Sequence, residues 1–150
     1  MKFEIVRWLP TLLAALLTVP GPAASQASAP LNLVSIKEAE LPNASVATTR
    51  AITRGPSVKL STGPDVSGKS FALKVRFESR GGMKIDGSSV RMEYLKEPLV
   101  DVTDRIKPFA SADALDIPVA SLPAGEHHFR VSVKDAEGRL GAALITLRAR

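Results

Sequence analysis

The fold is decided by one stretch near the C-terminus, Phe129-Arg130-Val131-Ser132-Val133-Lys134-Asp135-Ala136-Glu137-Gly138. Its first, third and fifth residues are apolar, and the residues between them are polar. Alternation with a period of two is typical of a β-strand that buries one face and exposes the other. The last four residues, Asp135 to Gly138, have the composition of a tight hairpin turn in which glycine takes the left-handed conformation. We therefore expect a return strand from about Leu140 to Leu147.

Period-two alternation recurs upstream, and turn residues separate the alternating segments. Pro118 interrupts one of them, so that strand should lie at a sheet edge or carry a bulge. Seven short strands at this spacing are typical of an all-β immunoglobulin-like sandwich, which is the fold class we expect. The expected strands are Ser57–Leu60, Phe71–Glu78, Val90–Tyr94, Leu99–Val102, Leu115–Val119, His128–Lys134 and Leu140–Leu147.

Residues 129–138 and three segments before them carry a resemblance to a known family. The three segments are Ile85-Asp86-Gly87-Ser88-Ser89-Val90, Val100-Asp101-Val102-Thr103 and Leu122-Pro123-Ala124-Gly125-Glu126-His127. In their order of turns and strands they resemble the bacterial immunoglobulin-like domains of envelope and cell-surface proteins. The resemblance implies a spacer, an adhesive module or a binding platform, with no shared catalytic residues. The chain holds a single copy, about residues 57–150, which favours binding over a spacer role.

The N-terminal residues have the features of a secretion signal. Lys2 and Arg7 form a short basic region. The uncharged, apolar run Trp8–Val19 follows, and then the small-residue stretch Pro20–Ala29. The apolar run is shorter than the roughly 20 residues of a spanning helix, so we expect cleavage within residues 25–29 rather than a membrane anchor. The chain has no cysteine for a lipid anchor, so we expect periplasmic or secreted localisation, without stable membrane insertion after signal cleavage.

Composition divides the chain into three parts. Residues 1–27 are the expected signal peptide. Residues 28–56 are rich in Ala, Ser and Thr and follow neither a strand nor a sustained helix period. We interpret them as a linker that is either disordered or holds a short helix around Ala44–Ile52. Residues 57–150 form the expected immunoglobulin-like domain, because a chain of this length supports one such core and not two.

The charge of the mature chain is mildly positive. Lys2, Glu4 and Arg7 leave with the signal, so 18 basic and 14 acidic side chains remain. This excess would help the protein approach anionic envelope polymers. Acidic residues are interleaved with the basic ones, so the pattern does not indicate nucleic-acid binding. Because cysteine is absent, the chain has no disulfide, thiolate nucleophile or cysteine metal site.

Basic side chains on the expected outer faces are the candidate contacts with a partner. In one interpretation they are simply solvated; in the other they form a surface for an acidic protein or a phosphate-bearing polymer. The loop Arg80–Lys84 is basic and glycine-rich and lies at the end of the expected sandwich, where binding loops are common. We therefore predict Arg80, Lys84 and Arg91 as the binding residues.

One motif resembles a nucleotide-binding loop. Gly63-Pro64-Asp65-Val66-Ser67-Gly68-Lys69-Ser70 matches the phosphate-binding template G-x-x-x-x-G-K-[ST]. That template needs a helix after the lysine, so that the helix N-terminus faces the phosphates. Here the strand pattern of Phe71–Glu78 follows instead, and Pro64 removes one amide donor from the loop. We interpret the match as an ordinary turn.

The two histidines, His127 and His128, are adjacent and raise the hypothesis of a metal site. Consecutive side chains of a strand point to opposite faces, so the two cannot readily share one ion. A metal would have to use His128 or Asp101 instead. We expect no metal site, no cofactor and, without a G-x-S-x-G nucleophile motif, no catalysis. Four loop carboxylates are of the type that binds a hard cation such as calcium, but their spacing matches no calcium-binding loop. They are Asp101, Asp104, Asp113 and Asp116.

The expected function is that of an exported, non-catalytic immunoglobulin-like module. It would be a protein-binding or accessory component of the periplasm or cell envelope. Its partner would be an envelope protein or an anionic envelope polymer. The alternative is a periplasmic carrier of a small ligand or of a metal, of the copper type. A carrier would show ligand stabilisation that His128→Ala or Asp101→Ala abolishes.

Overall fold

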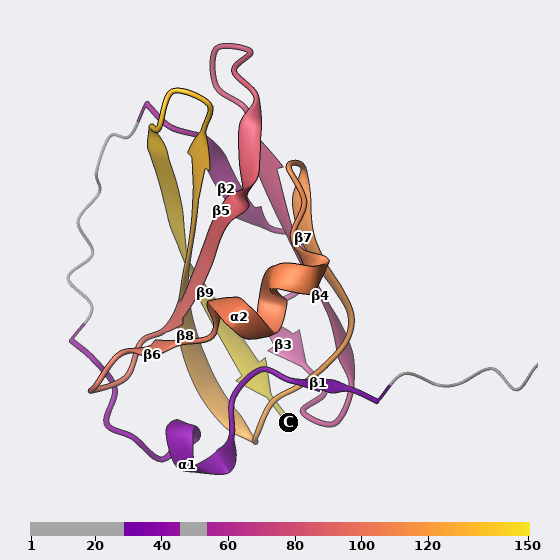
Figure 1. The fold of residues 1–150 in the computed structure, drawn as a ribbon. Helices are drawn as coiled ribbons and strands as arrows, with labels where there is room; N and C mark the ends of the chain where they lie inside the picture. The colour runs from indigo at the N-terminus through magenta and orange to yellow at the C-terminus, as the bar shows by residue number, and fades with distance from the viewer. Residues whose placement is uncertain (1–28, 46–53) are drawn as a thin grey trace, which may run out of the picture.

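The computed structural model describes residues 29–45 and 54–150 (Figure 1). The expected signal peptide, residues 1–27, lies outside the described residues, and so does most of the short helix considered at Ala44–Ile52. Across the two described ranges, no helix has the length and apolar character needed to cross a membrane.

The described residues form nine strands and three short helical segments. Each of the seven expected segments contains a strand, but the expected number is wrong because two strands of two residues each are added. So short a strand has no alternation from which it could be recognised. The strands are β1 (Leu31–Asn32), β2 (Ser57–Leu60), β3 (Asp65–Val66), β4 (Phe71–Glu78), β5 (Ile85–Tyr94), β6 (Val100–Asp101), β7 (Ala114–Ser121), β8 (Gly125–Asp135) and β9 (Leu140–Ala149). The helical segments are α1 (Ile36–Ala39), α2 (Thr103–Ile106) and the 3-10 turn η1 (Lys107–Phe109).

The strands form two sheets. The first sheet has the spatial order β1-β7-β4-β2, and the second sheet has the order β3-β9-β8-β5-β6. Neighbouring strands are antiparallel, except that β1 is parallel to β7 and β3 is parallel to β9. The pairing of β4 with β7 is irregular between Phe71 and Leu73, opposite Pro118. Of the two alternatives predicted at that proline, a sheet edge or a bulge, the structure shows the irregular pairing, and β7 lies between β1 and β4.

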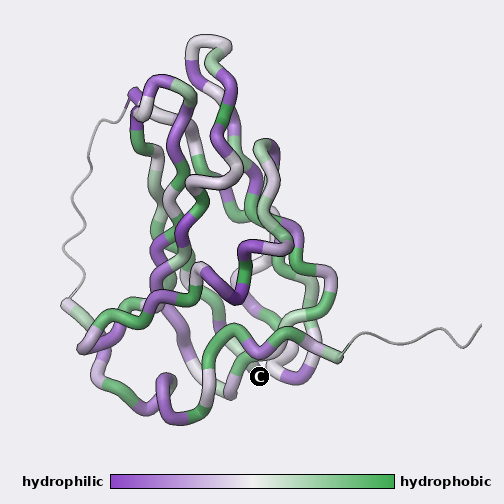
Figure 2. The backbone as a smooth tube through the Cα atoms, viewed as in Figure 1, coloured by the Kyte–Doolittle hydropathy of each residue, from purple (hydrophilic) through white to green (hydrophobic). Residues whose placement is uncertain are grey.

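Residues from both sheets form one hydrophobic core. On β4, Leu73, Val75 and Phe77 are buried and the residues between them are exposed. The tube in Figure 2 shows this alternation as changes of colour along the strands. Each large apolar side chain that is fully buried contributes roughly 1.5–3 kcal/mol to stability. The predicted burial of alternate residues is confirmed for β4, and also for β8, where Phe129 and Val131 are buried.

The two sheets approach each other closely where β2 and β9 begin. A Cβ atom added at Gly141 would overlap the carbonyl oxygen of Pro56, and one added at Gly55 would overlap the backbone of Leu140. Glycine, which has no Cβ, leaves room for this backbone contact. The chain just before residue 57 is therefore packed against β9, so the expected domain boundary falls inside the folded structure.

Residues 31–45, which we call the arm, belong to the folded domain. Leu33 and Val34 are 0% and 3% exposed, and both are part of the core. β1, the first element of the arm, pairs with β7 of the first sheet. The expectation of a linker over residues 28–56 is therefore wrong for the arm. The arm has no regular hydrophobic period, because two adjacent side chains, Leu33 and Val34, are buried and Leu31 is partly buried against the core.

Candidate functional site

The predicted contact residues lie in two different places. Arg80 and Lys84 lie in the loop between β4 and β5, at the top of Figure 1. The carbonyl oxygen of Lys84 accepts a hydrogen bond of 2.9 Å from the backbone N–H of Ala136, which places this loop beside the β8–β9 turn. Arg91 lies further along β5, opposite Ser132 of β8, four residues or roughly 13 Å along β8 from Ala136. The three predicted residues are therefore divided between the β4–β5 loop and the strand beyond it.

Arg91 follows a bulge in β5. The pairing of β5 with β8 jumps from Asp86 opposite Lys134 to Arg91 opposite Ser132. The Ser89 hydroxyl accepts a 2.7 Å hydrogen bond from the Lys134 backbone N–H and donates one of 2.6 Å to the Asp86 carbonyl. This side chain therefore replaces ladder hydrogen bonds that the bulge removes, which stabilises the irregular backbone.

The bulge lines a cleft beside α2 and η1. Two cavities of about 220 and 380 Å³ adjoin there and share Ser88, Val90 and Lys107. Arg91 and Asp101 both line the smaller cavity, so the structure brings together two side chains that the sequence analysis had considered separately. We call this site the β5 cleft and define it by its lining residues Ser88, Val90, Arg91, Asp101, Asp104 and Lys107.

Some charged side chains of the β5 cleft form ion pairs with each other, and Arg91 does not. Lys107 and Asp104 form an ion pair of 2.6 Å. Hydrogen bonding by Thr103, whose backbone N–H donates to Asp101 at 2.8 Å, lowers the pKa of that carboxyl, and the positive charges of Arg91 and Lys107 add to this effect. Arg91 itself forms no ion pair with the residues that the structure describes. The guanidinium of Arg91 is therefore the cation of this cleft that no carboxylate of the described residues neutralises.

The two candidate metal ligands, His128 and Asp101, lie apart. His128 contacts the carboxylate of Glu126, with 3.2 Å between Nε2 and Oε1. Asp101 lies opposite Glu93, whose carboxylate is held by Arg130 at 2.6 Å. In the described part of the chain, no group of three or more histidine or carboxylate side chains is placed to hold a metal ion.

His127 points into the core rather than toward a ligand. It is 2% exposed, and both ring nitrogens are hydrogen-bonded. The carbonyl oxygen of Pro123 can only accept, so Nε2 carries the hydrogen of this 2.8 Å bond, and Nδ1 accepts from the Tyr94 hydroxyl at 2.8 Å. Burial is the main cause that lowers the pKa of His127 below its ordinary value of 6.5. The folded protein therefore favours the neutral imidazole.

This buried histidine predicts a loss of stability in mild acid. Below pH 6.5 the unfolded chain binds a proton at His127 that the folded protein resists, so the free energy of unfolding should fall as the pH is lowered. We expect the His127 contribution to be up to about 1 kcal/mol between pH 7.5 and 5.5, measured by urea unfolding. His127→Gln should reduce this pH dependence, and His128→Gln should keep it. Equal pH dependence in the wild type and both variants would contradict the assignment.

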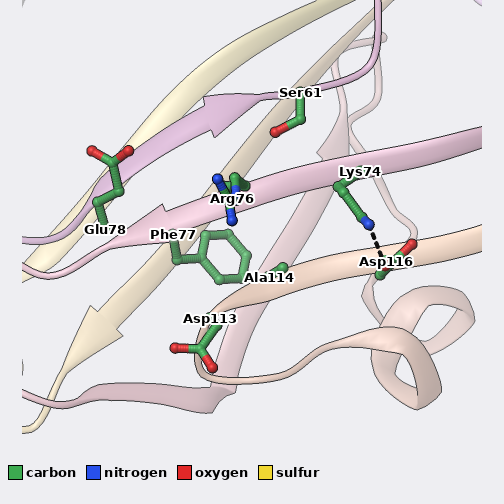
Figure 3. Close-up of a pocket in the computed structure, with 8 residues that line it drawn as sticks. All are labelled: Ser61, Lys74, Arg76, Phe77, Glu78, Asp113, Ala114 and Asp116. Carbon is green, nitrogen blue, oxygen red and sulfur yellow. Dashed lines mark ion pairs between the residues drawn. The ribbon is translucent and has the colours of Figure 1, made fainter.

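The sequence analysis missed a groove on the outer face of the first sheet. The groove has a volume of about 720 Å³ and lies over β4 and β7. In Figure 3, Lys74 reaches Asp116, and the two form an ion pair of 2.8 Å. Three carboxylates and two cations line it, so the groove offers mixed charge rather than a basic site. No sequence signal pointed to the groove, because its residues come from strands that are far apart along the chain. Its charged lining residues are Lys74, Arg76, Glu78, Asp113 and Asp116.

The segment that resembles a nucleotide-binding loop has no helix after it. Residues 63–70 contain β3, and β4 begins at the next residue, Phe71. Val66 pairs with Ala149 of β9 and is buried, which ties the segment to the second sheet. The interpretation as a connection between strands is therefore confirmed, with β3 as an addition.

Comparison with known proteins leaves the geometry as the basis for interpretation. No protein-family model matches the sequence, and no curated protein shows significant similarity to it.

Proposed function

We propose that the protein is an exported, non-catalytic immunoglobulin-like module that binds a protein or an anionic polymer of the periplasm or cell envelope. The observation that carries this proposal is the Arg91 guanidinium, which lies in the β5 cleft without an ion-pair partner among the described residues. Export is supported by the basic, apolar and small-residue segments of residues 1–29.

The immunoglobulin-like assignment rests on the arrangement of the longer strands. Antiparallel strands β2, β4 and β7 form one ladder, and β9, β8 and β5 form another. Inward-facing residues of both ladders meet in one core. This arrangement is compatible with an immunoglobulin-like sandwich, whose members present binding surfaces on their strands and loops.

A non-catalytic role agrees with the state of the two histidines. His127 is buried, and both of its nitrogens are occupied by Tyr94 and Pro123. His128 contacts Thr146 and Glu126. Neither imidazole is described next to a serine hydroxyl, which is the arrangement that nucleophilic catalysis requires.

The β5 cleft has the chemistry to bind an anionic group. A guanidinium presents planar N–H donors that fit a carboxylate or a phosphate with two parallel hydrogen bonds. Lys107 lies in the same cleft, and its ion pair with Asp104 is exposed to solvent. Exposed ion pairs are worth at most about 1 kcal/mol, so an incoming anion can compete with Asp104 for this ammonium.

A capture experiment tests this proposal and locates the surface. The mature protein is crosslinked in its native envelope fraction, and captured proteins are quantified by mass spectrometry. The cleft variant Arg91→Glu/Lys107→Glu should lose the captured partner by about tenfold or more, because two attractive charges become repulsive. The loop variant Arg80→Glu/Lys84→Glu changes the net charge equally and should keep the partner.

The outcomes separate the two surfaces. Loss of the partner in the loop variant alone would move the binding site to the loop between β4 and β5. Equal loss in both variants would indicate non-specific attraction by net charge. No enrichment over an uncoupled matrix would contradict a protein-binding role.

A further inference from the structure

The arm is held on the domain by six residues of the body, which we call the arm seat: Leu95, Lys96, Glu97, Arg105, Ala120 and Ser121. Leu31 lies opposite Ala120, and Asn32 lies opposite Ser121, in the parallel pairing of β1 with β7. The backbone N–H of Leu33 continues this pairing with a 3.2 Å hydrogen bond to the Ser121 carbonyl. The arm therefore adds a strand to the edge of the first sheet.

Arg105 of α2 holds both the backbone and a side chain of the arm. Its guanidinium donates to the carbonyl oxygen of Leu33 at 2.7 Å and to the two carboxylate oxygens of Glu38 at 2.6 and 3.0 Å. The hydrogen bond from Arg105 is the main cause that lowers the pKa of Glu38 to about 2. Such a two-pronged pair between guanidinium and carboxylate is directional and selects an acidic residue at this position.

The arm presents Glu38 to Arg105 through its own short helix. The Ser35 hydroxyl accepts from the backbone N–H of Glu38, and the Glu38 carboxylate accepts from the backbone N–H of Ser35. This capping box fixes the turn that directs the carboxylate toward Arg105. The arm therefore carries its own recognition pattern: two adjacent apolar residues, then a capped turn with a carboxylate.

Lys96 binds the backbone of the arm and not the side chains of the arm. It is 6% exposed, and its ammonium donates to the carbonyl oxygens of Ala39 and Leu41 at 2.9 and 2.8 Å. The ammonium also lies 5.4 Å from the centre of the Tyr94 ring. If the arm left, this ammonium would lose both carbonyl acceptors, and only water could replace them. The arm seat therefore favours an occupied state.

We propose that the arm seat is a peptide-binding site that the arm occupies in cis, and that a partner protein can fill it with an extended segment of the same pattern. The segment has two adjacent apolar residues, as at Leu33 and Val34, and a carboxylate four residues after the second. Strand addition of this kind takes affinity from the backbone and specificity from a few side-chain contacts. The inference rests on the proposed protein-binding function and names the kind of partner.

The covalently attached arm competes with any such segment. An attached ligand acts at an effective concentration of the order of millimolar, so a free peptide of equal affinity binds the wild-type protein weakly. A change in the arm that leaves the arm seat intact should therefore increase binding of a free peptide. A change in the arm seat should abolish it.

The test uses the full mature protein and a fluorescent synthetic peptide of residues 30–45. Glu38→Ala weakens the arm but not the arm seat, so the peptide should bind this variant about tenfold more tightly than the wild type, measured by fluorescence anisotropy. Glu40→Ala is the matched control, because this acidic residue of the arm forms no ion pair with the described residues. Adding Arg105→Ala to the Glu38→Ala variant should remove the gain.

A crosslink shows where the peptide binds. The chain has no cysteine, so Ser121→Cys in the Glu38→Ala protein and Asn32→Cys in the peptide introduce a single pair. We expect a disulfide to form there and not with Ser61→Cys, which lies outside the arm seat. If Glu38→Ala prevents folding, Ser35→Ala replaces it, because loss of the helix cap weakens the arm with an expected gain of about fivefold.

Two results would overturn the inference. One is that the peptide binds the wild type, Glu38→Ala and Ser35→Ala with equal affinity. The other is that the disulfide forms equally at Ser121→Cys and at Ser61→Cys. The capture experiment at the β5 cleft uses other residues. If the peptide does not bind but the β5 cleft captures a partner, only the arm seat is rejected. If the peptide binds but no partner is captured, only the β5 cleft is rejected.

Discussion

Replacing Gly141 with alanine is expected to lower the free energy of unfolding by about 3 kcal/mol. The added methyl group would overlap the carbonyl oxygen of Pro56. This oxygen belongs to the backbone, so no side-chain rotation can relieve the overlap, and β2 and β9 must move apart. That movement would weaken the packing of the core between the two sheets. Urea unfolding followed by far-UV circular dichroism measures the loss.

Gly63→Ala is the matched control for this substitution. A Cβ atom at Gly63 would meet nothing within 4 Å, so the change should alter stability by less than about 0.5 kcal/mol. A Gly141→Ala protein as stable as the control would mean that β2 and β9 do not approach as closely as the structure shows.

Leu33→Ala is expected to cost about 2–5 kcal/mol, the usual range for removing a large buried side chain from a core. Leu33 is fully buried in the core although it lies in the arm. Its loss would leave a cavity beside β7 and would also loosen the strand that β1 adds to the first sheet. Urea unfolding of the full mature protein measures the change.

Ile36→Ala is the control from the same arm. Ile36 is 70% exposed, so its truncation should change stability by less than about 0.5 kcal/mol. If residues 28–56 were a linker, as the sequence analysis expected, both substitutions would be neutral. A neutral Leu33→Ala would therefore restore the linker interpretation.

The strands of the two sheets were largely predictable because their signal is local. Residues 129–138 alternate and then turn, and Gly138 has the left-handed conformation expected for this hairpin, with φ of +78°. The Asp135 carboxylate accepts from the backbone N–H groups of Glu137 and Arg139 and so stabilises the turn. Pattern and turn chemistry agree at this place, and the prediction was correct there.

The arm was not predictable for the opposite reason. Its contacts come from residues that are distant along the chain: Arg105 is 67 residues from Glu38, and Lys96 is 55 residues from Leu41. The short capping-box pattern at Ser35 and Glu38 was present in the sequence and could have indicated a helix start. It could not have shown what the helix packs against.

The candidate site was predictable in part. Arg91 was expected as a binding residue, and the structure places it in a cleft together with Asp101. Arg80 and Lys84, the other two predicted residues, lie in the loop between β4 and β5, on the other side of the bulge from Arg91. Whether Arg91 binds a partner stays a prediction that the capture experiment tests.

The sequence by itself determined which residues of β4 and β8 face the core and where the β8–β9 hairpin turns. Both follow from interactions between neighbours along the chain, and a period of two is visible in one segment alone. Only the tertiary structure decided that the arm joins the core, that Gly141 meets Pro56 and that the bulge of β5 lines a cleft. These features depend on contacts between segments far apart in the sequence, and the packing of the two sheets brings those segments together.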